Sequence, residues 1–327
     1  MDAPDPFNLD RFPVHDFVTL VSPPQNFDGG EEAYDEAVGG ANREDLLACG
    51  RGALRLARHY SRRPIQSLVE IGAGGGTCSL GLVSAASDCT CLITDTSPRF
   101  LQMIRGKLAR HGIDRQGVRF ATLSGEDLQK LPVQSADLVV VASALHHVSD
   151  WRRFLADSFA ILRPGGTLVF QEPCREGNLM MALALDFALS PAWGKSDELS
   201  ADDRRRITRL RDSIYFLNDS TVDKVGEDKH VFLMAEVADV ASQSGFVRSA
   251  FYANYHFEDL LTADLSVRMA SSSISDYLRA FLKHHHGVSA EGLGLLDKHL
   301  FPLMRRLDDA FVARSGVPIM GCMALCR

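Results

Sequence analysis

Residues 67–76 read Ser-Leu-Val-Glu-Ile-Gly-Ala-Gly-Gly-Gly, a short apolar strand that runs directly into a glycine-rich turn. The glycines at positions 72, 74 and 76 alternate along this turn. Each lacks the Cβ atom that would collide with a ligand lying close to the backbone. Residues 77–86 follow with a composition compatible with a helix. The segment therefore predicts a strand, a tight loop and a helix N-terminus that together form a nucleoside-binding turn.

A dinucleotide-binding fold is the first alternative, because it also begins with a glycine-rich turn after a strand. Its fingerprint is Gly-x-Gly-x-x-Gly, and here Thr77 occupies the third glycine position. Glu70 also precedes the first glycine by two residues, where a carboxylate would repel a pyrophosphate. A cationic ligand without phosphates suits this loop better, so nicotinamide chemistry is disfavoured.

The run Glu70-x-Gly72-x-Gly74-x-Gly76 resembles the first motif of class I S-adenosylmethionine-dependent methyltransferases of the small-molecule type. The segments Leu145-His-His-Val148 and Leu162-Arg-Pro-Gly-Gly166 are also similar to segments of that family, and the likeness covers roughly residues 60–173. The resemblance implies an S-adenosyl-L-methionine cofactor. It also implies a doubly wound α/β sheet of seven mostly parallel strands, in the order 3-2-1-4-5-7-6 with the last strand antiparallel.

The resemblance assigns cofactor contacts to residues at the ends of successive strands. Asp95 ends the strand 89–95, and a carboxylate there accepts hydrogen bonds from ribose hydroxyls. Asp127, five residues before Pro132, takes the position that contacts the adenine amino group, with Glu126 beside it. The alternative for Asp127 is that it only caps a helix together with Ser124. The predicted cofactor set is Glu70, Gly72, Gly74, Gly76, Asp95, Thr96, Glu126, Asp127 and Ser143.

His146 and His147 follow the strand 136–143, beside the expected position of the methyl donor. A phenol or alcohol acceptor needs a base, and histidine accepts a proton near neutral pH. We predict that His147 is the base or an acceptor-orienting group, with His146 as the second candidate. The alternative is that these imidazoles only pack in the turn. Oxygen is the first expected acceptor atom, followed by nitrogen and carbon.

Three segments lie outside the predicted nucleotide-binding strands. Residues 1–60 form an N-terminal helical or cap segment, and residues 174–230 and 258–314 form two helical cap insertions. Ligands of open α/β sheets bind beyond the carboxyl ends of the strands, where these insertions emerge. We therefore expect a closed pocket for a small-molecule acceptor. The cofactor-binding core then comprises residues 61–173, 231–257 and 315–327.

Composition limits the partners and the compartment. The 327 residues carry a formal net charge of −7 at pH 7, which argues against general affinity for nucleic acid or an anionic membrane. No apolar run approaches the length needed to span a bilayer. The seven cysteines lack any Cys-x-x-Cys spacing. A cytoplasmic protein with reduced thiols is expected, and a homodimer is compatible with the sequence.

The run His284-His285-His286 raises the question of a metal site. Successive helical residues point about 100° apart, so three adjacent histidines of a helix do not converge on one ion. No metal site is predicted. Two other functional classes stay open: a catalytically silent nucleoside-binding scaffold or regulator, and a non-methylating enzyme that uses S-adenosylmethionine on the same fold. A defined base and acceptor site would separate a methyltransferase from both.

Overall fold

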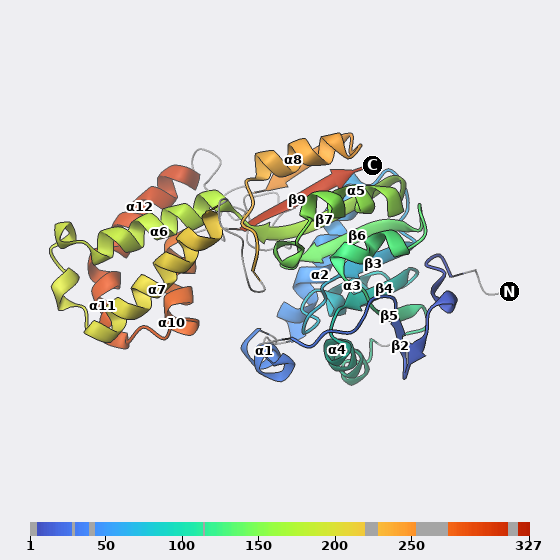
Figure 1. The fold of residues 1–327 in the computed structure, drawn as a ribbon, viewed down its shortest axis with the longest axis horizontal. Helices are drawn as coiled ribbons and strands as arrows, with labels where there is room; N and C mark the ends of the chain where they lie inside the picture. Colours follow the sequence, from blue (N-terminus) through green and yellow to red (C-terminus); the bar gives the residue numbers. More distant parts are fainter. Residues whose placement is uncertain are drawn as a thin grey trace.

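The structure is a computed structural model that describes residues 5–27, 30–38, 43–113, 115–219, 228–252, 274–312 and 320–327. Figure 1 shows an α/β body, in which helices cover a central sheet, and a separate helical lobe beside it. Within the described residues, no helix is both long enough and apolar enough to cross a bilayer. Six of the described cysteines are free thiols.

The central sheet has nine strands in the order β1-β2-β5-β4-β3-β6-β7-β9-β8. Its middle five strands run parallel. They are β3 (Ser67–Ile71), β4 (Thr90–Asp95), β5 (Val118–Thr122), β6 (Ala136–Ala142) and β7 (Leu162–Pro173). β9 (Met320–Cys326) pairs antiparallel with both β7 and β8 (Arg248–Tyr252). The predicted order 3-2-1-4-5-7-6 with an antiparallel last strand is therefore confirmed.

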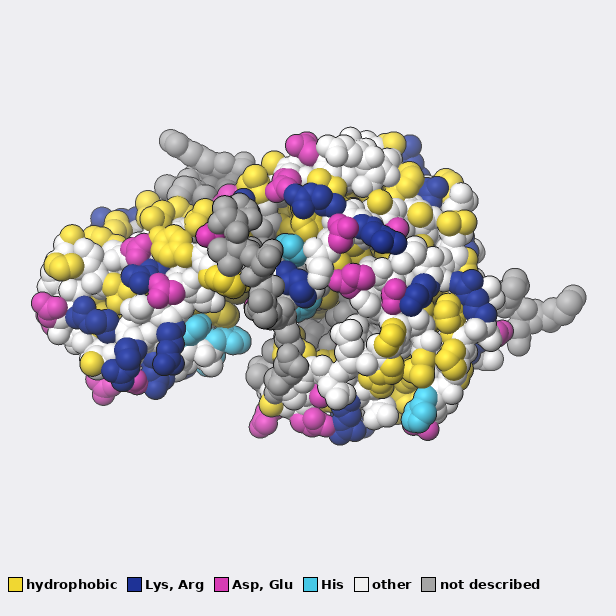
Figure 2. All heavy atoms as spheres, in the orientation of Figure 1, with side chains coloured by type: hydrophobic (Ala, Val, Ile, Leu, Met, Phe, Trp, Pro, Cys, Tyr) yellow, Lys and Arg dark blue, Asp and Glu magenta, His cyan; other side chains and the backbone are white. Residues whose placement is uncertain are grey.

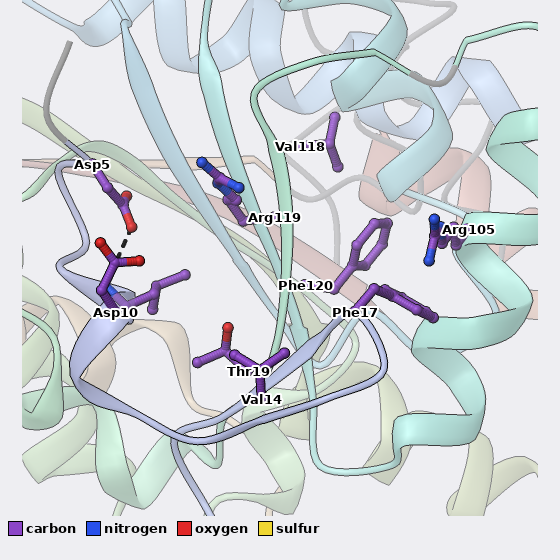
Figure 3. A pocket seen from close by; sticks show the side chains of 10 residues that line it. Asp5, Asp10, Val14, Phe17, Thr19, Arg105, Val118, Arg119 and Phe120 are labelled. Carbon is purple, nitrogen blue, oxygen red and sulfur yellow. Dashed lines mark hydrogen bonds between the residues drawn. The ribbon is translucent and has the colours of Figure 1, made fainter. Parts of the chain in front are cut away.

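Two short strands at the other edge of the sheet were not expected from the sequence. β1 (Val14–His15) pairs antiparallel with β2 (Val18–Leu20), and β2 pairs in parallel with β5. Strands of two and three residues are too short to show a hydrophobic alternation. A cavity of about 360 Å³ lies at this edge, between β1, β2, β5 and the Arg105 side chain (Figure 3). None of the predicted site residues lines it.

Helices cover both faces of the sheet (Figure 1). One face carries α2 (Arg43–Tyr60), α3 (Ser79–Ala85) and α4 (Pro98–Arg110), and the other carries α5 (Trp151–Ile161) and α8 (Met234–Gln243). Along β6, Val139 and Val141 pack into one hydrophobic core, while Leu138 and Val140 pack into the other. A strand that is buried on both faces is apolar throughout, and this explains the continuous apolar run at positions 138–141. A further helix, α1 (Glu31–Val38), precedes α2.

The helical lobe has a hydrophobic core of its own. The lobe consists of α6 (Arg175–Leu189), α7 (Ala201–Asn218), α10 (Ile274–His284), α11 (Ala290–His299) and α12 (Phe301–Val312). Leu185, Ile207, Leu278 and Phe301 are among its buried side chains. The two predicted insertions thus pack together into one body. Figure 2 shows a hollow between this lobe and the α/β body on the face in view.

Asp137 joins the amino ends of β3 and β6. Its fully buried carboxylate accepts hydrogen bonds from the N–H groups of Gln66 and Ser67 at 2.9 and 3.0 Å. It also accepts one from Arg163 at 3.1 Å and pairs with Arg63 at 2.8 Å. This network therefore fixes the end of the sheet opposite the glycine loop.

Asp137→Ala is expected to lower the free energy of unfolding by about 3 kcal/mol, because two arginines and two backbone donors lose their acceptor. Urea unfolding followed by circular dichroism measures this loss. Asp88, an exposed acid near the start of β4, provides the control. Asp88→Ala should change stability by less than about 0.5 kcal/mol. Equal losses in the two variants would contradict the role given to Asp137.

Candidate functional site

The glycine loop between β3 and α3 folds back onto the protein. All three motif glycines have positive φ angles, of 67°, 50° and 87°, a region that favours glycine. The Ala73 N–H donates to the Thr94 carbonyl at 2.9 Å, and the Gly74 N–H donates to the Asp95 carboxylate at 2.8 Å. The Gly76 N–H donates to the Ala73 carbonyl at 2.9 Å. These three amides are not available to a phosphate, which agrees with the expectation of a ligand without one.

Asp95 fixes this loop from the end of β4. Its other oxygen accepts the Ser97 N–H at 2.9 Å. Burial raises the pKa of Asp95, and the hydrogen bonds from Ser97 and Gly74 oppose this shift. A carboxylate has about four acceptor positions, so Asp95 retains capacity for the predicted ribose hydroxyls. The adjacent Thr96 is partly buried, and its carbonyl accepts the Gln25 N–H at 2.9 Å.

Glu70 lies beneath the loop near the end of β3 and is 1% exposed. Burial raises the pKa of Glu70 to about 8; the nearby Ser79 hydroxyl opposes the shift and the nearby Asp95 adds to it. The carbonyl of Glu70 accepts the Thr94 hydroxyl at 2.6 Å, which ties β3 to β4. With this pKa, Glu70 is largely uncharged at pH 7, and a positively charged ligand bound nearby would favour its ionised form.

Helix α1 is attached to the glycine loop through a buried lysine. Lys107 from α4 donates to the Gly75 carbonyl at 2.7 Å and forms an ion pair with Asp35 of α1. A Cβ atom at Gly75 would lie 2.3 Å from the Asp35 carboxylate. Glu31, also on α1, accepts the Ser97 hydroxyl at 2.6 Å. The N-terminal helix is therefore part of the site.

The two predicted adenine contacts lie on the short helix η2 (Gly125–Lys130). Asp127 accepts hydrogen bonds from the Ser22 hydroxyl at 2.7 Å and the Lys130 ammonium at 2.8 Å. Burial opposes the shift, but Lys130 and Ser22 hold the pKa of Asp127 below its usual value. Glu126 accepts the Ser149 N–H at 2.9 Å. Through this bond, η2 is joined to the turn that carries the two histidines.

The histidine turn, η3 (Leu145–His147), is built around the carboxylate of Glu172 at the end of β7. This fully buried carboxylate accepts the N–H groups of Ala144 at 2.9 Å, Leu145 at 2.6 Å and His146 at 3.3 Å. It also lies 2.6 Å from Nδ1 of His146. Because a carboxylate only accepts, Nδ1 carries a hydrogen. Nε2 of His146 is therefore the nitrogen left for other chemistry. Just before the turn, Ser143 has a positive φ of 55°.

The charges around His146 favour its protonated form. Burial alone would lower the pKa of His146, but the carboxylates of Glu172 and Asp228 raise it to about 9. The side chain is 15% exposed, so it is reachable from outside. An imidazole whose one nitrogen is fixed by a buried acid is arranged to accept a proton at the other.

A segment distant in sequence completes the turn. The Lys229 N–H donates to the His146 carbonyl at 2.9 Å, and its ammonium donates to the His147 carbonyl at 2.6 Å. The preceding Asp228 lies 3.4 Å from Nε2 of His146 and 3.5 Å from Nδ1 of His147. His147 is more exposed than His146, at 39% of its side chain. The buried orienting acid thus belongs to His146.

The structure brings the predicted residues to one edge of the sheet. The glycine loop, Asp95, η2 and η3 follow β3, β4, β5 and β6, which lie next to one another and run parallel. Ligands of open α/β sheets bind at this edge, where the strand order reverses. Glu172, Lys107 and Asp228 are among the residues of the site that were not expected from the sequence. The sequence contains a signal for Glu172, which is an acid near the end of the strand that follows β6. For Asp228, the neighbouring sequence contains no such signal.

Comparisons with known proteins find methyltransferase domains and proteins that are named as methyltransferases or synthases. Residues 69–170 match the model of the methyltransferase domain. The squalestatin tetraketide synthase of Phoma sp. (strain C2932) is 26% identical over 237 residues, which cover 67% of this chain and 9% of that protein. The ubiquinone/menaquinone biosynthesis C-methyltransferase UbiE of Marinomonas sp. (strain MWYL1) is 27% identical over 222 residues, which cover 62% of this chain and 83% of that protein. The chain spans only 4% to 9% of the length of four synthases among its relatives.

The fold is also similar to that of solved structures. A structure assigned to a sarcosine dimethylglycine methyltransferase from Galdieria sulphuraria superimposes with a TM-score of 0.50 and 14% identity, covering 91% of this chain and 98% of that one. At this identity, the likeness supports the fold alone. The domain match, the relatives and the strand order agree with the glycine motif, and residues 69–170 of this chain form a methyltransferase domain of the class I S-adenosylmethionine-dependent type.

Proposed function

We propose that this chain transfers a methyl group from S-adenosyl-L-methionine to an acidic carbon of a small acceptor that carries two nearby carbonyl groups. The observation that carries the proposal is the pair of His146 and Glu172, whose Nδ1 and carboxylate lie 2.6 Å apart. A carbon acceptor has no lone pair to attack with until it loses a proton, so it depends on a base. A buried acid–imidazole pair supplies one.

The cofactor would lie along the glycine loop, Asp95 and η2. When bound, it supplies an electrophilic methyl group on a positively charged sulfur. The inward-turned loop amides support a cofactor without phosphates, and a cationic cofactor would favour the ionised forms of the nearby Glu70 and Asp95. Asp95 would accept the ribose hydroxyls, and Asp127 with Glu126 would meet the adenine. Gly72, Thr96 and Ser143 remain in the proposed contact set.

His146 would act as the base through Nε2. Glu172 keeps the hydrogen of the neutral ring on Nδ1, so Nε2 is the nitrogen that would take the proton of the acceptor. The same carboxylate then stabilises the imidazolium. Because the pKa of His146 is raised to about 9, the neutral form that acts as a base gains population as the pH rises toward 9. His147 lies next to it in the turn, with ring centroids 4.0 Å apart, and would orient the acceptor. General base catalysis of this kind contributes about 10²–10⁴-fold in rate.

The acceptor class rests on the relatives. Several are named as tetraketide, diketide or hybrid synthases, and another as a C-methyltransferase of quinone biosynthesis. A ketide carries carbonyl groups on alternate carbons, so the carbon between two carbonyls is acidic. We therefore propose carbon as the acceptor atom in place of oxygen, the first acceptor expected from the sequence. A β-ketoacyl thioester is the simplest compound of this class.

Incubation with S-adenosylmethionine and the β-ketoacyl thioester of a small thiol should give a product with one added methyl group. Mass spectrometry detects the group, and NMR should locate it on the carbon between the carbonyls. His146→Ala should lower turnover by about 10²-fold or more while it leaves cofactor binding intact. Glu172→Gln should act in the same direction, and His147→Ala should lower turnover less. The exposed His15 on β1 serves as the control, as His15→Ala.

Full activity in His146→Ala would remove this residue from the mechanism. Cofactor binding by the wild-type chain without methyl transfer to any oxygen, nitrogen or carbon acceptor would favour the silent scaffold instead.

Asp95→Ala should weaken the binding of S-adenosylmethionine and S-adenosylhomocysteine more than about tenfold, which corresponds to about 1.4 kcal/mol. The variant removes both the ribose acceptor and the anchor of the Gly74 amide. Calorimetric titration measures the two affinities, with NADH as a ligand that should not bind. An unchanged affinity would show that Asp95 does not hold the ribose.

Lys107→Met should weaken cofactor binding by roughly tenfold, because α1 and the Gly75 carbonyl lose their shared partner. Asp35→Asn should have a smaller effect in the same direction, since the lysine still reaches the loop. Arg110→Ala, on the same helix and exposed, is the control. If Lys107→Met lowers thermal stability but binds the cofactor normally, the contact is structural and the expectation is wrong.

A further inference from the structure

Three potential metal ligands converge beside the proposed base. Nε2 of His146, Nδ1 of His147 and a carboxylate oxygen of Asp228 all lie within 4.8 Å of one another. Two of the three separations are shorter, at 3.4 Å from His146 to Asp228 and 3.5 Å from His147 to Asp228. The two histidines are adjacent in sequence, but Asp228 comes from a segment beyond the whole of β7, α6 and α7.

These separations match the distances between neighbouring ligand atoms in a tetrahedral metal site. Zinc binds imidazole nitrogen and carboxylate oxygen at about 2.0–2.2 Å with tetrahedral geometry, which places neighbouring ligand atoms about 3.3–3.6 Å apart. The two measured separations to Asp228 agree with that value. The remaining separation, between the two nitrogens, is at most 4.8 Å and would have to shorten by rotation of the partly exposed His147 ring when an ion binds.

Neighbouring residues hold the three side chains in place, as outer-shell partners do in metal sites. Glu172 accepts the hydrogen of His146 Nδ1 at 2.6 Å, which leaves Nε2 as the coordinating nitrogen. Lys229 holds the carbonyls of both histidines and thereby places Asp228 next to them. The Asp228 and His147 side chains are 59% and 39% exposed, so an ion has access from solvent.

We propose that His146, His147 and Asp228 bind one divalent transition-metal ion of the zinc class, and that the bound ion inhibits methyl transfer. Three protein ligands leave a fourth coordination position for water. The ion occupies the Nε2 lone pair that the acceptor proton needs, so metal and base function exclude each other. The inhibitory effect rests on the proposed function, whereas the binding of the ion does not.

Metal binding is tested on the full chain after treatment with EDTA and removal of the chelator. Titration with Co²⁺, followed by its visible absorption, should show one ion per chain, which Zn²⁺ then displaces. Asp228→Asn and His147→Ala should each weaken binding more than about tenfold, because even the loss of an outer-shell partner costs 10- to 100-fold. The neighbouring His230 serves as the control, since its Nε2 faces the Ser149 carbonyl at 3.2 Å. His230→Ala should retain the wild-type affinity.

No cobalt spectrum with the wild-type chain, or equal affinity in Asp228→Asn, would overturn the metal site. Thermal unfolding of each variant without metal shows that a loss of binding does not come from a loss of fold. Methyl transfer is then measured with and without Zn²⁺, and EDTA should restore the rate. Faster transfer with Zn²⁺ would overturn the inhibitory role while it leaves the site in place. If the chain transfers no methyl group at all, the proposed function fails but the cobalt titration still decides the metal site.

Discussion

The carboxylate of Glu172 is the group on which the arrangement of the site depends. It accepts hydrogen bonds from three consecutive backbone N–H groups of the histidine turn and, in addition, one from Nδ1–H of the His146 ring. A buried carboxylate without such donors would be strongly destabilising. The same carboxylate therefore stabilises the folded turn and orients the imidazole. The acid fixes the backbone after β6 and the side chain that the backbone carries.

Asp95 plays the corresponding part on the other side of β3. It also ends a parallel strand and accepts backbone N–H groups, from Gly74 in the glycine loop and from Ser97 at the start of α4. Two acids at the carboxyl ends of β4 and β7 thus hold the loops that follow β3 and β6. Since β3 and β6 are neighbours in the sheet, the two loops lie beside each other. Cofactor and acceptor chemistry meet there because each loop is tied to the strand on its outer side.

Much of the core was predictable because its signals are local. The run 67–76 contains the strand, the loop and the helix start, and the apolar run at 138–141 contains a strand buried on both faces. The shared pairing of Glu172 with His146 was not predictable, because it depends on the register between β6 and β7. The position of Asp228 was even less predictable, since the bonds of Lys229 bring it to the turn from far along the chain. β1 and β2 are too short to produce a pattern, and they are defined by their pairing with each other and by the pairing of β2 with β5.

The helical lobe is joined to the base by the continuity of the chain. Glu172 is followed by Pro173 and Cys174, and α6 begins at Arg175. The Arg175 N–H donates to the Phe232 carbonyl, and the Phe232 N–H donates to the Pro173 carbonyl, both at 2.9 Å. The segment that brings Asp228 to the histidines is thus also paired with the junction between β7 and the lobe. The strand end, the histidine turn and the first lobe helix form one connected unit, so an acceptor held by the lobe would have a fixed position relative to His146.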